Sequence, residues 1–138
     1  MAISLQTQGH KGVVRVPEIT IDLDGGSVSI CGESYPEEGR QYFDEAFEEF
    51  FRYYQGRTEA CLKVLFSLTY YNSGSEHFFM HLVTFLDALA AAGNDVEVTS
   101  RFFEDDDSMR DRGEDIAEEL KHARFVMDEI SDDHENEG

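Results

Sequence analysis

The sequence predicts an α/β fold: a mixed sheet of about five strands with helices packed on it, in the order β-β-α-β-α-β-α-β. Three observations predict it. Apolar residues alternate over residues 62–70, which is the period of a strand, and recur at helical spacing over residues 78–89. Four small polar residues, 72–75, separate the two patterns. Strand, tight turn and helix in this succession form the repeating unit of an α/β sheet.

The first half of the chain predicts a hairpin followed by a helix. Alternating apolar residues over 13–31 flank the turn Asp24-Gly25-Gly26, and Pro17 places the first strand at an edge or a bulge. A helix starts near Pro36, whose missing N–H suits a first turn, and stops at Gly56. Its apolar stripe is aromatic and indicates core packing: Phe43, Ala46, Phe47, Phe50, Phe51 and Tyr54.

Two further units follow the strand at 62–70 and its helix. Residues 96–102 alternate as a strand, residues 108–122 predict a helix interrupted or kinked near Gly113, and residues 125–130 predict a last strand. Right-handed crossovers make the last three strands parallel. Because Leu65 and Cys61 make the second face of strand 62–70 partly apolar, we expect that strand to be covered on both sides.

Length and composition fit one domain, residues 1–130, with an acidic tail at 131–138 that is expected to be disordered. No stretch of about 18 apolar residues is present, and the first twelve residues lack the apolar region of a secretory signal. The chain is therefore expected to be cytoplasmic. Cys31 and Cys61 lie in strand-like alternations and are interpreted as buried, reduced thiols.

The net charge of −19 narrows the choice of partners. Residues 104–138 contain 15 acids and 4 bases, and residues 1–103 contain 15 acids and 7 bases. This field repels phosphate backbones, so neither nucleic acid nor an anionic membrane is expected as a partner. Most of the acidity is best explained as a solvated face, and salt adaptation is an alternative explanation.

The sequence predicts no metal or cofactor site and no enzyme. The acidic run at 105–114 has Met109 at the third ligand position of a calcium loop, and no glycine follows it there. His77 and His81 share a helix face without a third ligand. Ser73 with His77 makes a small serine hydrolase an alternative, but the chain lacks the G-x-S-x-G elbow of such enzymes. No glycine-rich phosphate loop with a lysine is present.

The turn at residues 72–75 predicts a capping box. Ser73 stands three residues before Glu76, so its hydroxyl is positioned to accept from the N–H of Glu76 while the carboxylate reaches back. Ser73 then sits where a central strand ends and a helix begins. In an open α/β sheet, ligands and partners are usually met at that edge.

Three segments resemble one family. They are GESYPE at 32–37, LTYYNSGS at 68–75 and FFEDDDSMRDRGEDIAEEL at 102–120, and together they resemble SiaC-type bacterial regulatory phosphoproteins. The resemblance covers residues 13 to 130 and implies a STAS-like fold, similar to anti-sigma-factor antagonists. Gly74 and Glu38 depart from residues common in the family. The family-motif residues are Gly32, Ser34, Tyr35, Pro36 and Glu37.

The resemblance implies a partner switch without enzymatic activity. A Ser/Thr kinase phosphorylates one hydroxyl at the strand-to-helix turn, and a phosphatase removes the phosphate. The unphosphorylated form binds and activates a diguanylate cyclase, which promotes aggregation or biofilm growth through cyclic di-GMP. By motif, the modified residue is Ser73, within a turn that comprises Asn72, Gly74, Ser75 and Glu76. A STAS-like antagonist that sequesters an anti-sigma factor is the alternative of the same class.

Overall fold

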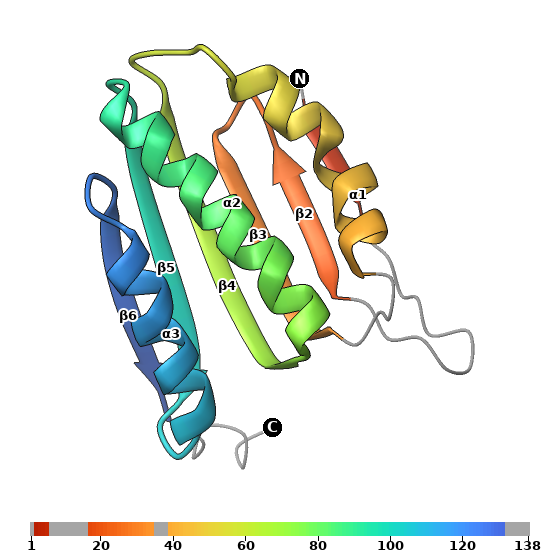
Figure 1. The fold of residues 1–138 in the computed structure, drawn as a ribbon, viewed down its shortest axis with the longest axis vertical. Coiled ribbons are helices and arrows are strands. Elements are labelled where there is room, and N and C mark those ends of the chain that lie inside the picture. The colour runs from red at the N-terminus through yellow and green to blue at the C-terminus, as the bar shows by residue number, and fades with distance from the viewer. Residues whose placement is uncertain (1, 6–16, 35–38, 132–138) are drawn as a thin grey trace.

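The computed structural model describes residues 2–5, 17–34 and 39–131. Within these residues, one six-stranded sheet carries three helices (Figure 1). The strands are β1 (Ala2–Leu5), β2 (Glu18–Asp22), β3 (Ser27–Ser34), β4 (Cys61–Tyr71), β5 (Asp95–Phe103) and β6 (Arg124–Ile130). The helices are α1 (Gly39–Tyr54), α2 (Ser73–Ala91) and α3 (Asp107–Glu119). The predicted α/β class and element order are confirmed, and β1 is an additional strand at the N-terminal edge.

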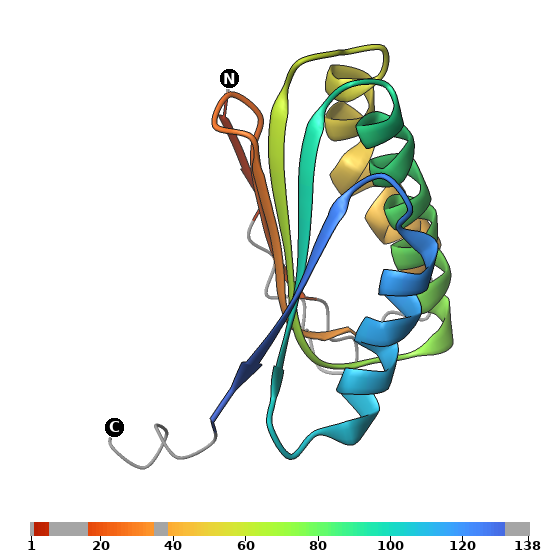
Figure 2. The ribbon, with the colours of Figure 1, turned by 90° about the vertical axis from the view of Figure 1, so that its left-hand side faces the viewer.

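The strands follow one another across the sheet in sequence order. β1, β2 and β3 are antiparallel neighbours, whereas β3, β4, β5 and β6 are all parallel. Three successive crossovers that advance in one direction with the same handedness place their helices on the same face. Figure 2 shows this arrangement, with α1, α2 and α3 on one side of the sheet.

The prediction that β4 is covered on both sides is therefore wrong. Its helix-facing side chains are buried, but Lys63 and Thr69 on the other face are exposed, and Leu65 and Ser67 are half-buried. A strand that reverses the order of the sheet would be needed to bring a helix to that second face.

Aromatic rings from α1 and α2 form the core above the sheet. Phe43, Phe47 and Phe50 of α1 are fully buried, as is Phe78 of α2. The rings of Phe43 and Phe78 stack with their centroids 4.7 Å apart. This aromatic interface anchors α2, and with it the turn that precedes α2.

Helix α3 lies close to the sheet because it contains a glycine. A Cβ on Gly113 would lie 2.8 Å from Met127 Sδ and 2.9 Å from Ser100 Oγ, so a larger residue would require these two side chains to shift. The helix runs through Gly113 without the predicted interruption. The glycine provides close packing between a helix and two strands.

The loop between α3 and β6 is fixed to α2 by one carboxylate. Asp87 Oδ1 accepts hydrogen bonds from the backbone N–H groups of Lys121, His122 and Ala123 at 2.7–3.0 Å. Burial raises the pKa of the Asp87 carboxyl, but the three backbone donors outweigh it and hold the pKa below its ordinary value. These bonds attach the loop that follows α3 to α2.

Several predictions need correction or lie outside the described residues. Both cysteines are free, but Cys61 is exposed and Cys31 is only half-buried, since each lies on the sheet face without helices. Residues 13–16 of the hairpin and 132–138 of the acidic tail are outside the described part of the chain. No helix in the described ranges is both long and apolar enough to cross a bilayer.

We expect the aromatic interface to dominate stability. Phe47→Ala removes a fully buried ring and should lower the free energy of unfolding by about 3–5 kcal/mol in denaturant melts. Phe85→Ala is the matched control, because Phe85 on α2 is only half-buried and its loss should cost distinctly less. Because Phe85 also contacts Phe50 and Phe51 of α1, equal costs for the two variants would mean that the burial of each ring does not decide its contribution to stability.

Candidate functional site

The turn between β4 and α2 lies at the carboxyl edge of the sheet. Ser34, the last residue of β3, pairs with Tyr71, the last residue of β4. Asn72 and Ser73 follow directly and start α2. Because β3 to β6 are parallel, the carboxyl ends of four strands meet at this edge, where α/β sheets usually bind their ligands.

Asn72, not Ser73, caps α2. Its backbone is extended, with φ −88° and ψ 179°, and its Oδ1 accepts from the N–H of Ser75 at 2.9 Å. Ser73 is already the first helical residue. The predicted capping box is therefore wrong: asparagine is as good a cap as serine, and the strand delivers Asn72 to the cap position first.

The cap leaves the two serines of the turn in opposite environments. The Ser73 side chain is exposed, and its hydroxyl has no hydrogen-bond partner among the described residues. Ser75 is 0% exposed. In the folded domain the hydroxyl of Ser73 is therefore accessible from solvent and that of Ser75 is not. Gly74, between them, is half-buried.

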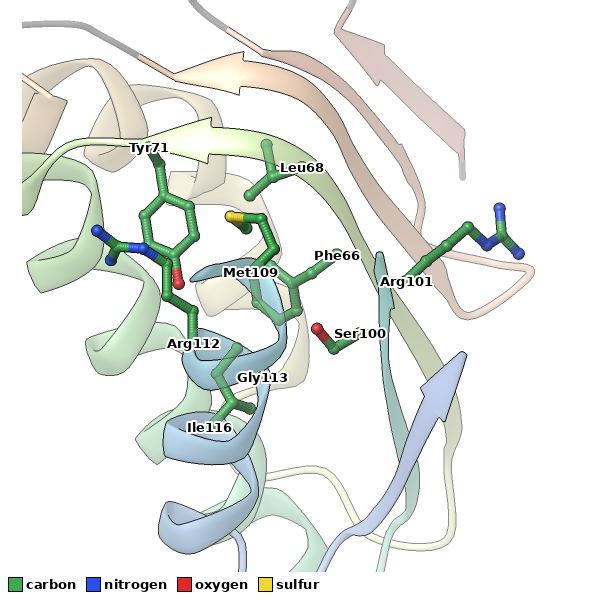
Figure 3. A pocket seen from close by; sticks show the side chains of 9 residues that line it. All are labelled: Phe66, Leu68, Tyr71, Ser100, Arg101, Met109, Arg112, Gly113 and Ile116. Carbon is green, nitrogen blue, oxygen red and sulfur yellow. The ribbon is translucent and has the colours of Figure 1, made fainter. Parts of the chain in front are cut away.

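The Glu76 carboxylate forms an ion pair with α3 and takes no part in the cap. Its Oε1 lies 3.2 Å from Nη1 of Arg112 on α3, with side-chain exposures of 39% for Glu76 and 26% for Arg112. The Arg112 guanidinium also covers the ring of Tyr71, with its Cζ 4.3 Å from the ring centroid (Figure 3). One arginine thus connects α3 to the end of β4 and to the first turn of α2.

The side chains of this cluster shift one another's pKa values. Burial raises the pKa of the Tyr71 hydroxyl, and a hydrogen bond with Arg112 lowers it in part. Burial lowers the pKa of Arg112, but Tyr71 and Glu76 outweigh it, so the net pKa is raised and the guanidinium stays charged. The edge therefore holds a permanent cation beside Ser73's helical turn.

The family-motif residues lie partly at this edge. Gly32 has φ +106°, a conformation that favours glycine, and the β3–β4 register shifts between Gly32 and Glu33. The shift brings Ser34 beside Tyr71. Tyr35, Pro36 and Glu37 lie outside the described residues.

The cavity behind Tyr71 and Arg112 is very small. Its volume is about 10 Å³, room for about one water molecule. Figure 3 shows its lining, in which Arg101 points away toward the other face of the sheet. The remaining lining residues are Phe66, Leu68, Ser100, Met109, Gly113 and Ile116. A cavity of this size does not admit a nucleotide or a metabolite.

The alternative chemistries find no support in the described residues. No group of three His, Cys, Asp or Glu side chains there is arranged to hold a metal ion. The His81 ring packs edge-on against Phe51, with centroids 5.7 Å apart, and His77 is exposed. No carboxylate hydrogen-bonded to His77 is found in the described part of the chain, so the hydrolase hypothesis lacks its orienting group.

Sequence reasoning missed Arg112. The residue stands in an acidic stretch, Asp111-Arg112-Gly113-Glu114, where an arginine is readily interpreted as part of a solvated face. A signal was available in Gly113, because a glycine that brings a helix close to a sheet also brings its neighbour close to the strand ends.

Comparisons with known proteins agree with one another. A sequence model of the SiaC family regulatory phosphoproteins matches residues 10–130. Two structures of SiaC from Pseudomonas aeruginosa are similar: one has 20% identity, a TM-score of 0.77 and coverage of 94% of this chain and 99% of the other. The second, apo-SiaC, has 21% identity and a TM-score of 0.76, with 91% and 98% covered.

A third similar structure is the crystal structure of the diguanylate cyclase SiaD in complex with its activator SiaC from Pseudomonas aeruginosa. It matches at 21% identity and a TM-score of 0.79, with 91% of this chain and 99% of the other covered. A comparison with curated proteins found no match.

The assignment of the cap predicts that substitutions of two adjacent residues change the free energy of unfolding by different amounts. Asn72→Ala should lower the free energy of unfolding by about 0.5–2 kcal/mol, because the N–H of Ser75 loses its acceptor. Ser73→Ala, the matched control, should stay within about 0.5 kcal/mol of the unsubstituted chain, as exposed substitutions do. Thermal melts that rank the two variants in the reverse order would restore Ser73 as the cap.

Proposed function

The chain belongs to the SiaC family of regulatory phosphoproteins, and from this premise we propose that Ser73 is its phosphorylated residue and the control point of a partner switch. In the unphosphorylated state the chain binds and activates a diguanylate cyclase. A dedicated kinase adds a phosphate to Ser73, which blocks this binding, and a phosphatase restores it.

The observation that carries the proposal is the environment of the Ser73 hydroxyl. It is exposed, stands on the first residue of α2 and is not used in the cap. Ser75, the nearest competing hydroxyl, is buried. A modification at Ser73 therefore changes the surface of the carboxyl edge without breaking a bond that the fold needs.

The folded domain is expected to tolerate the phosphate. A phosphate adds about −1.5 to −2 charges, and the free N–H groups and dipole at a helix N-terminus favour an anion there by about 0.3–1 kcal/mol. The Asn72 cap stays in place because it does not involve Ser73. Phosphorylation thus acts on partner binding rather than on folding.

Burial of the turn by a partner makes the same phosphate costly. A charge that loses its water without gaining a counter-ion costs several kcal/mol. A cost of about 4 kcal/mol corresponds to about a thousandfold weaker binding. The unphosphorylated serine has no such penalty, so the switch follows from desolvation at a docking surface.

The choice of a cyclase as partner is supported by the relatives. The similar SiaC of Pseudomonas aeruginosa is the activator of the diguanylate cyclase SiaD. The net charge of −19 favours a basic or apolar docking surface on a protein over nucleic acid.

An affinity pulldown with the wild-type chain and Ser73→Asp, followed by mass spectrometry, tests the class of partner. Recovery of a diguanylate cyclase on the wild-type chain, with a kinase and a phosphatase, is the expected result. Recovery of a sigma-factor regulator instead would favour the anti-sigma-factor antagonist alternative, and stoichiometric nucleic acid would overturn the charge argument.

Titration of the recovered cyclase tests the switch quantitatively. The chain with phosphoserine at position 73 should bind about a thousandfold more weakly than the unmodified chain, by isothermal calorimetry. Ser73→Ala should bind like the unmodified chain and resist the kinase. If the phosphorylated and unmodified chains, both folded by circular dichroism, bound equally, the partner-switch mechanism would be wrong.

A further inference from the structure

Arg112 has unused hydrogen-bonding capacity at the edge that contains Ser73. A guanidinium has five N–H donors in a planar fork. The described contacts of Arg112 are Glu76 at 3.2 Å and the Tyr71 side chain. The side chain is 26% exposed, so it is only partly shielded from solvent.

Ser73 lies on the same side of α2 as the Glu76 carboxylate. Residues i and i+3 of a helix are surface neighbours, with their Cβ atoms about 5–6 Å apart. Glu76 already reaches Arg112. A phosphate on Ser73 therefore lies within one helical turn of the carboxylate that contacts this guanidinium.

Resting on the function proposed above, we propose that Arg112 binds the phosphate of phosphorylated Ser73. Its guanidinium then exchanges the ion pair with Glu76 for an ion pair with the phosphate. The exchange joins the first turn of α2 to α3 through the modified residue. It identifies Arg112 as the residue through which this fold responds to its own phosphorylation.

The competition favours the phosphate. A phosphate has up to two charges and three acceptor oxygens, whereas the Glu76 carboxylate has one charge and two. Arginine binds phosphate through two parallel N–H···O bonds, and such bonds are stronger when partly shielded from water, as they are here. Leaving Arg112 with Glu76 would instead keep the phosphate, with its up to two charges, without a counter-ion, whereas the exchange leaves only the single charge of Glu76 uncompensated.

The exchange gives the two states different surfaces. In the unmodified chain Arg112 neutralises Glu76, and both lie beside the end of β4. In the phosphorylated chain the Glu76 carboxylate is released and adds its charge to an edge that already contains Asp115 near Tyr71. Arg112 neutralises only one of the phosphate's up to two charges, so a partner that fits the first surface meets a partly neutralised phosphate and a carboxylate without a counter-ion, and the desolvation cost argued above remains.

The experiment uses the full chain with phosphoserine inserted at position 73 during translation, so it does not depend on a kinase. The second ionisation of the phosphate is followed by ³¹P NMR as the pH is raised. A neighbouring cation lowers this midpoint, so Arg112→Gln should raise it by about one pH unit. Glu76→Gln should lower it, because the competitor for Arg112 is gone.

Arg110→Gln is the matched control. Arg110 lies on the same helix, but it pairs with Asp107 at 3.4 Å and faces the ring of Phe102, away from the cluster. Its loss should leave the midpoint unchanged. If Arg112→Gln and Arg110→Gln had the same effect on the midpoint of the phosphate ionisation, the proposal that Arg112 binds the phosphate would be wrong.

A second measurement needs no substitution of Arg112. The N–H resonances of Arg112 in ¹⁵N-labelled chains should shift when serine at position 73 is replaced by phosphoserine, and those of Arg110 should not. An unmoved Arg112 signal would overturn the proposal. These results are distinct from failure of the proposed function, which would appear as equal cyclase binding by the two chains whatever Arg112 does.

Discussion

The order of the parallel strands is the constraint on which the rest of the molecule depends. β3 to β6 advance across the sheet without a reversal, so right-handed crossovers place every helix on one face. The same order brings four strand ends to one edge. Asn72 and Ser73 follow the end of β4 there, and Arg112 of α3 lies at the same edge. The candidate site is thus a consequence of topology before it is a consequence of particular side chains.

Local capping then decides which residue of the turn is available. Because Asn72 leaves β4 in an extended conformation, its side chain satisfies the N–H of Ser75, and the helix begins one residue earlier than a serine cap would allow. Ser75 turns inward as a result, while Ser73 faces solvent. An exposed hydroxyl and a stable helix start therefore coexist in four residues, since the cap uses the Asn72 side chain and leaves that of Ser73 exposed.

Sequence patterns predicted the strands and helices whose periodicity is strong, such as the alternation at 62–70 and the aromatic stripe of α1. They did not predict β1, a four-residue edge strand too short to show a period. The cap was misplaced because serine and asparagine suit that position equally. The pairing of Glu76 with Arg112 joins residues 36 positions apart and depends on how Gly113 lets α3 approach the sheet, which no local pattern encodes.

Hydrogen–deuterium exchange of the chain, alone and with the proposed cyclase partner, tests most directly whether the carboxyl edge is the docking surface. We expect slower exchange in the complex at the start of α2, residues 73–77, and on the neighbouring turn of α3 around Arg112. The exposed face of β4, around Lys63 and Thr69, should be unchanged. Protection confined to that sheet face, with the start of α2 unaffected, would contradict the account.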